Sequence, residues 1–154
     1  MRESLLIPSL SPSRTPAAIL YSTQSSFLLA FFAGPFAIIL YSALNSWKLR
    51  RPMDALLYLP ALALSTAFFV AVQTGYAPLM TVADAIGAGG ERILSRALAM
   101  ALFGVVYLMH RKQYRSAVLF GAKPPAPWIP AIACGALAYG MTWVVLYYAK
   151  ALSV

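Results

Sequence analysis

The chain has 154 residues, of which 61% are hydrophobic and 10% are charged. A soluble domain has a charged fraction of about 25% and does not collect its apolar residues into long blocks. The composition therefore excludes an ordinary soluble enzyme and predicts an integral membrane protein. Lys and Arg outnumber Asp and Glu by 12 to 4. These cations flank apolar blocks, which indicates contact with lipid headgroups rather than with nucleic acid.

The apolar blocks predict an all-α integral membrane protein, a bundle of four transmembrane helices in a single domain at 26–154. Each span needs roughly 20 residues, so four spans leave no room for a soluble domain of 50 or more. The four predicted spans are 26–46, 54–77, 93–109 and 128–149.

The chain starts with a segment, 1–25, whose prolines predict an irregular tail. Pro8 interrupts its short apolar run, so we expect a retained anchor rather than a cleaved signal peptide. The first span follows, and Pro35 near its centre predicts a kink. It ends at Trp47 and Lys48, an aromatic belt residue followed by a basic cluster. In the second span, Pro60 lies near the first turns, where a missing N–H donor costs least.

Between the second and third spans, a proline and several glycines predict a loop of about a dozen residues. They are Pro78, Gly87, Gly89 and Gly90. The third span is short and stops at His110 and a basic cluster. A proline-rich linker leads to the fourth span, which starts at Trp128 with Pro130 in its first turn, where proline is tolerated.

The distribution of cations predicts the orientation of such a bundle. Seven lie in the first and third loops, against five on the other side. The seven are Lys48, Arg50, Arg51, Arg111, Lys112, Arg115 and Lys123; the five are Arg2, Arg14, Arg92, Arg96 and Lys150. By the positive-inside rule the loops with seven are cytoplasmic. We therefore expect a multi-pass protein of a bacterial inner membrane with both termini outside the cytoplasm.

The ionisable residues suggest no catalytic constellation. Asp54 lies at one end of the predicted bundle, next to arginines and at a helix N-terminus, whereas Asp84 and Glu91 lie beyond the other end. His110 adjoins cations and is interpreted as part of an interfacial basic cluster. One His and one Cys, Cys134, make no recognisable metal or Cys/His site; a haem ligated with help from another subunit stays as an alternative. We expect neither enzymatic activity nor a cofactor.

Two arginines beside the glycine-rich loop are candidate contacts for an anion or a partner. Arg92 and Arg96 are four positions apart, on one face of the predicted third helix. About 13 uncharged residues follow, so Arg96 has to reach outward to the interface or find a partner at shallow depth. The alternatives are snorkelling to water and contact with a lipid headgroup, an anionic ligand or a partner carboxylate.

Rows of small residues predict close helix contacts, because helices in lipid associate largely through close backbone packing. The candidate packing or partner residues are Ala63, Ala67, Ala71, Gly75, Gly135 and Gly140. Contact within the chain's own bundle and contact with an external helix both remain open.

The segment FFAGPFA from Phe31 to Ala37, with Asn45 and Arg51 after it, resembles a pattern in uncharacterised small bacterial multispanning membrane proteins. In that pattern F-x-G-G-P-x-A precedes an Asn and a basic loop, and Ala33 replaces its first glycine. The resemblance covers the first span and its loop, about a quarter of the chain. It implies a membrane fold and a bacterial origin, and no catalytic role.

These observations favour a non-catalytic protein that acts by binding in the bilayer. The expected partner is another membrane protein or a second copy, as for an accessory, assembly or immunity-type subunit. The alternative is a small oligomeric transporter or channel, for which the kinks at Pro35 and Pro60 and the shallow Arg96 would be used.

Overall fold

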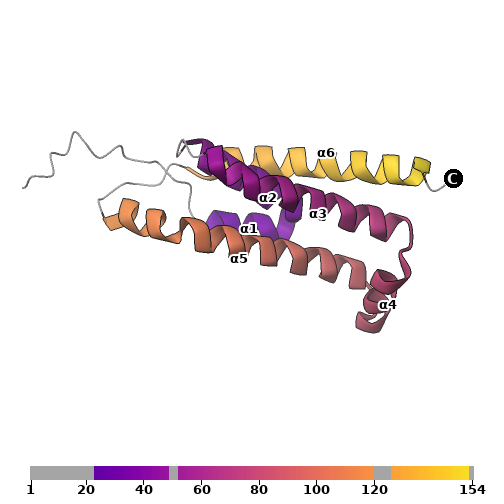
Figure 1. The fold of residues 1–154 in the computed structure, drawn as a ribbon. Coiled ribbons are helices and arrows are strands. Elements are labelled where there is room, and N and C mark those ends of the chain that lie inside the picture. Colours follow the sequence, from indigo (N-terminus) through magenta and orange to yellow (C-terminus); the bar gives the residue numbers. More distant parts are fainter. Residues whose placement is uncertain (1–22, 49–51, 120–125, 153–154) are drawn as a thin grey trace, which may run out of the picture.

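A computed structural model describes residues 23–48, 52–119 and 126–152, and every regular element in these ranges is helical (Figure 1). Most of the predicted tail, 1–22, lies outside the described residues. Three helices are long and apolar enough to cross a membrane: α3 (Ala55–Gln73), α5 (Gly90–Leu119, of which Gly90–Arg111 is the apolar part) and α6 (Trp128–Leu152). They correspond to the second, third and fourth predicted spans.

The first predicted span is not a single helix, so the four-span bundle is not confirmed. Residues 23–48 form α1 (Thr23–Ala33) and α2 (Pro35–Lys48), separated by Gly34 with φ +84°. The kink expected at Pro35 is therefore a complete break. At a rise of about 1.5 Å per residue, helices of 11 and 14 residues are about 16 and 21 Å long, too short for a hydrocarbon core of about 30 Å.

Contacts with α5 show that α1 and α2 fold back on each other as a helical hairpin. Along α1, Phe27 packs on Phe103, and Phe31 lies under Arg96, so α1 runs antiparallel to α5. Along α2, Ile38 packs near Ala99 and Ser46 reaches His110, so α2 runs parallel to α5. The hairpin tip at Gly34 therefore lies inside the bundle, and both hairpin ends, Thr23 and Lys48, lie at one end of it (Figure 1).

The hairpin supplies much of the core of the bundle. One cluster joins α1 and α2 to α6; its buried members are Leu29, Phe36, Ala37, Tyr41, Cys134 and Ala138. A second joins Ala30 and Ile38 to Ala99 of α5. Phe36 also stacks on Phe69 of α3, with ring centroids 5.4 Å apart. The hairpin is thus held on three sides, by α3, α5 and α6.

The predicted loop between the second and third spans contains a helix, α4 (Ala77–Ile86), which corrects that expectation. Pro78 lies in its first turn, and Gly87, with φ +95°, ends it. Proline at a helix start and glycine just after its end are normal end signals, so the residues that indicated a loop delimit a short helix. Gly90 then lets α5 begin close to α4, because a Cβ there would collide with the carbonyl group of Ala83.

A short 3-10 turn, η2 (Pro52–Asp54), leads into α3, which continues through Pro60. The described chain enters at Thr23 at the end where η2 lies, whereas α6 finishes at the opposite end (Figure 1). The hairpin therefore places the start of α1 and the end of α6 at opposite ends of the bundle.

The outer surface of the bundle suits lipid better than water. Large apolar side chains are exposed along the long helices, including Leu59 and Leu64 of α3 and Ile132 and Leu137 of α6. Contiguous apolar surface of this kind is rare on soluble monomers. The three long apolar helices are consistent with a membrane location.

Candidate functional site

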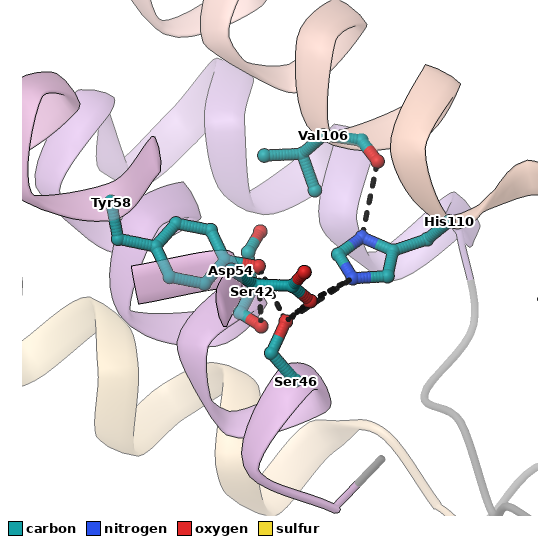
Figure 2. A network of polar contacts seen from close by, with 6 residues as sticks. All are labelled: Ser42, Ser46, Asp54, Tyr58, Val106 and His110. Atoms are coloured by element: carbon teal, nitrogen blue, oxygen red, sulfur yellow. Dashed lines mark hydrogen bonds and ion pairs between the residues drawn. The ribbon is translucent and has the colours of Figure 1, made fainter. Parts of the chain in front are cut away.

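Two candidate sites lie beside the hairpin, one at its base and one at its tip. At its base, where α2 ends, four buried side chains form a polar cluster: Ser46, Asp54, Tyr58 and His110 (Figure 2). They come from α2, η2, α3 and α5, so the cluster joins four elements. Asp54 is 8% exposed and His110 is 7% exposed. Burial of two ionisable groups is costly unless they are paired and hydrogen-bonded.

Ser46 is the centre of the polar cluster. Its Oγ donates a hydrogen bond to Asp54 Oδ2 at 2.7 Å and lies 2.6 Å from the Tyr58 hydroxyl and 3.2 Å from His110 Nε2. His110 Nε2 is also 3.4 Å from Asp54 Oδ2. The Tyr58 hydroxyl can donate to the Ser42 carbonyl at 3.1 Å. All four side chains therefore have polar partners (Figure 2).

The partners of the imidazole determine where its protons lie. His110 Nδ1 is 3.1 Å from the Val106 carbonyl oxygen, and a carbonyl can only accept, so Nδ1 carries a proton. When Ser46 donates to Asp54, both neighbours of Nε2 are acceptors. A proton on Nε2 or on Asp54 would give the contact between Nε2 and Asp54 Oδ2 a donor.

Although Ser, His and Asp are also the residues of hydrolytic triads, their geometry here differs. In such a triad the carboxylate binds one ring nitrogen and the serine binds the other. In the polar cluster Ser46 and Asp54 both lie at Nε2, while Nδ1 is used by the backbone. Ser46 is also 3% exposed. The arrangement therefore differs from that of a hydrolytic triad.

The polar cluster adds to one interpretation drawn from the sequence, the position of Asp54 at a helix N-terminus, and corrects another, that of His110. Asp54 is the residue before α3 but makes no capping hydrogen bond, and its carboxylate turns to Ser46 and His110. Its expected arginine neighbours, 50 and 51, lie outside the described residues. His110 is buried rather than part of an exposed basic cluster.

The sequence reasoning missed Ser46 and Tyr58 altogether. The signal that could have found them is the spacing of polar residues four positions apart. Ser42 and Ser46 share one face of a helix, and Asp54 lies just before the helix that contains Tyr58. Within the described ranges, no three His, Cys, Asp or Glu side chains come close enough to hold a metal ion.

The second site is a groove beside the hairpin tip, with a volume of about 490 Å³. It lies between the tip and the ends of α3, α5 and α6 that are remote from the polar cluster. Its apolar wall contains Phe31, Phe32, Phe68, Phe69, Val72 and Leu146. Its polar wall contains Gln73, Glu91, Arg92, Ser95, Arg96 and Thr142. We call it the tip groove.

The two arginines singled out in the sequence both line the tip groove. The guanidinium carbon of Arg96 lies 5.0 Å from the centre of the Phe31 ring, a cation–π contact. This contact gives Arg96 a partner at shallow depth. Among the described residues no carboxylate lies within 4.0 Å of either guanidinium, and the ion pair found there joins Asp54 to His110. Arg92 and Arg96 thus lie in one groove and remain available to an anion.

The predicted row of small residues on α3 is only partly covered by this chain: Ala71 is half-buried. Ala63 and Ala67 are exposed, and α3 instead turns Tyr58, Ala61 and Ser65 inward. Gly75 belongs to the helix end: it has φ +68°, and the next amide, of Tyr76, bonds back to the Ala71 carbonyl at 2.9 Å. This is the usual glycine-terminated helix end, so Gly75 is a stop signal rather than a packing residue.

On α6, one of the two glycines is placed as a packing residue. A Cβ on Gly135 would meet Ala33 at 3.7 Å, an ordinary contact with the hairpin. Gly140 faces open space.

Comparison of the chain with protein-family models, with curated proteins and with solved structures finds no match.

Proposed function

We propose that this protein acts by binding within the membrane, and that the tip groove takes the headgroup and upper acyl chain of an anionic phospholipid. The observation that carries the proposal is the position of Arg92 and Arg96 beside an aromatic wall, with no described carboxylate in reach. The proposal assigns the protein no covalent chemistry, in keeping with the expectation from the sequence.

The polar wall supplies the recognition of an anion. Guanidinium groups bind phosphate through two parallel N–H donors, and such charge-assisted bonds are stronger than neutral ones. The Phe31 ring already holds the Arg96 guanidinium against one face, which leaves the N–H edges free to donate. With Glu91 counted, the groove keeps a net positive charge, which favours an anionic over a zwitterionic headgroup.

The apolar wall explains why the ligand should be an amphiphile. Phe31, Phe32, Phe68 and Phe69 line the same groove as the two cations, so a bound molecule meets both charge and aromatic rings. A volume of about 490 Å³ lies in the range of small-molecule sites, about 300–1,000 Å³. It suits a headgroup with part of one chain rather than a folded partner.

Binding is tested by native mass spectrometry of the purified protein in mild detergent, with phosphatidylglycerol and phosphatidylcholine of matched acyl chains. We expect selective retention of phosphatidylglycerol. Each charge-assisted bond contributes about 1.5 kcal/mol, so Arg96→Ala should weaken retention roughly tenfold. Arg96→Lys should recover part of it, and Thr142→Trp should block the groove without changing its charge.

The matched control is Arg111→Ala, an exposed arginine on the same helix at the opposite end of the bundle. Equal retention of both lipids, unaffected by Arg96→Ala, would contradict the proposal. A co-purifying polypeptide released by Arg96→Ala would also contradict it, because the groove would then serve a membrane protein partner. That outcome would support the accessory or immunity-type subunit expected from the sequence.

A small oligomeric transporter is the second candidate function. The observation in its favour is the break at Gly34 inside the bundle, since discontinuous helices mark the binding sites of many transporters. The ionisable Asp54–His110 pair adds to it, because buried ionisable groups are common in proton pathways. Anion flux into proteoliposomes, abolished by Arg96→Ala, would favour this candidate over static binding.

A further inference from the structure

We propose that the polar cluster is a proton-binding site that fastens the hairpin base to the bundle. The bound proton lies between Asp54 Oδ2 and His110 Nε2, and it joins η2 to α5 while Ser46 brings in α2. This inference does not depend on the tip groove, which lies at the other end of the hairpin.

The hydrogen-bond inventory of the cluster calls for the proton. Nδ1 of His110 donates to Val106, and Ser46 has a single hydroxyl proton. In an unprotonated pair, that one proton would have to serve both Asp54 and Nε2. The contact of 3.4 Å between Nε2 and Asp54 Oδ2 would then bring two lone pairs together. With the proton present, every contact in this part of the cluster has a donor and an acceptor.

Tyr58 and Ser42 extend the inventory. Tyr58 can donate to Ser46 or to the Ser42 carbonyl, so its hydroxyl rotates with the direction of the Ser46 proton. The Ser42 hydroxyl is 1% exposed and has no hydrogen-bond partner among the described residues. When the Asp54–His110 pair loses its proton, the hydroxyls of Ser46, Tyr58 and Ser42 can therefore rotate to new partners. Each of these hydroxyls keeps its own proton.

Other titratable or charged side chains lie on the described elements around the cluster. They include Tyr41 and Lys48 on α2 and Tyr107 and Arg111 on α5; Tyr41 is buried and the other three are exposed. Helix α1 carries no titratable side chain. Release of the proton leaves a carboxylate facing a bare imidazole nitrogen, and the direct link between η2 and α5 is lost.

The sequence contains one histidine, which makes the test direct. The full-length protein, labelled with ¹⁵N-histidine and held in lipid nanodiscs, is studied by NMR at neutral pH. We expect Nδ1 to be protonated and Nε2 to be a protonated or proton-sharing nitrogen. Asp54→Asn should turn Nε2 into a bare acceptor already at neutral pH.

Asp84→Asn, which removes an exposed carboxylate at the other end, is the matched control and should leave the spectrum unchanged. The wild-type spectrum decides the matter even if Asp54→Asn does not fold. A bare Nε2 in the wild type at neutral pH would overturn the proposal, as would a histidine with its single proton on Nε2. An Nε2 signal that is the same in wild type and in folded Asp54→Asn would overturn it too.

Discussion

The two ends of the hairpin differ in how completely their polar groups are satisfied. At the base, Asp54 and His110 are buried and each has partners from other elements. At the tip, Arg92 and Arg96 are exposed to a groove and no described carboxylate reaches them. The polar groups of the base therefore join elements of the fold, while the two arginines at the tip stay open to the anion of the proposed function.

The largest effect should come from breaking the base. Asp54→Ala leaves His110 buried without its counter-group, and loss of one member of a buried pair costs about 3–5 kcal/mol. We expect a large fall in the thermal stability of the detergent-solubilised protein. The double variant Asp54→Asn/His110→Gln, with two neutral polar groups, should be more stable than Asp54→Ala. Equal thermal stability of Asp54→Ala and wild type would show that the cluster does not hold the base.

The corner between α4 and α5 should give the next largest effect. Gly90→Ala places a methyl group against the Ala83 backbone, and overpacking of this kind costs about 1–3 kcal/mol. Gly104→Ala on the same helix meets nothing within 4 Å and should be neutral or stabilising by up to about 1 kcal/mol. Thermal unfolding of the two variants side by side measures the difference, and the reverse order would be incompatible with the tight corner.

The hairpin tip should respond to a smaller strain. Gly34→Ala has room for a methyl group but forces a left-handed backbone conformation on alanine, at a cost of about 1–2 kcal/mol. Gly140→Ala, also in open space but in a helical conformation, is the control and should not destabilise the protein. If the two variants unfolded at the same temperature, the turn at Gly34 would not have the positive φ described above.

The smallest expected effect is on the aromatic support of Arg96. Phe31→Leu keeps an apolar wall but removes the cation–π contact, which contributes about 0.5–1 kcal/mol at an exposed site. Retention of phosphatidylglycerol should fall by a few-fold, with thermal stability almost unchanged. Phe32→Leu changes a ring on the same wall that does not stack on Arg96, so it should weaken the retention of phosphatidylglycerol less. A larger loss for Phe32→Leu than for Phe31→Leu would show that the Phe31 ring does not orient the Arg96 guanidinium.

Much of the architecture follows from the sequence because it depends on local signals. The long apolar blocks predict α3, α5 and α6, and Arg92 and Arg96, which were expected on one helical face, line the same groove. The hairpin is not predicted, because residues 26–46 have the length and apolarity of one span. Whether Gly34 and Pro35 kink a helix or reverse it depends on the neighbouring helices, which provide the contacts that hold a short helix in place.

The polar cluster could not be predicted for a related reason. Asp54 and His110 are 56 positions apart, and their neighbours in sequence gave each an adequate local explanation. The two residues meet only because α2 ends beside η2 and α5. That position of α2 depends on the hairpin, which the sequence does not predict. The tip groove shows the intermediate case: its arginines were predicted as a pair, while the phenylalanines of its apolar wall come from two other helices, α1 and α3.

The central claim, that residues 23–48 form a re-entrant hairpin, is tested most directly by cysteine labelling. After Cys134→Ala removes the one native cysteine, single cysteines replace Ser25, Trp47 or Tyr76, and intact and permeabilised cells are treated with a membrane-impermeant maleimide. The hairpin predicts that the cysteines at positions 25 and 47 react from the same side and the one at position 76 from the other. A cysteine at position 25 that reacts from the side of position 76, with position 47 protected there, would establish a spanning first helix and contradict the account.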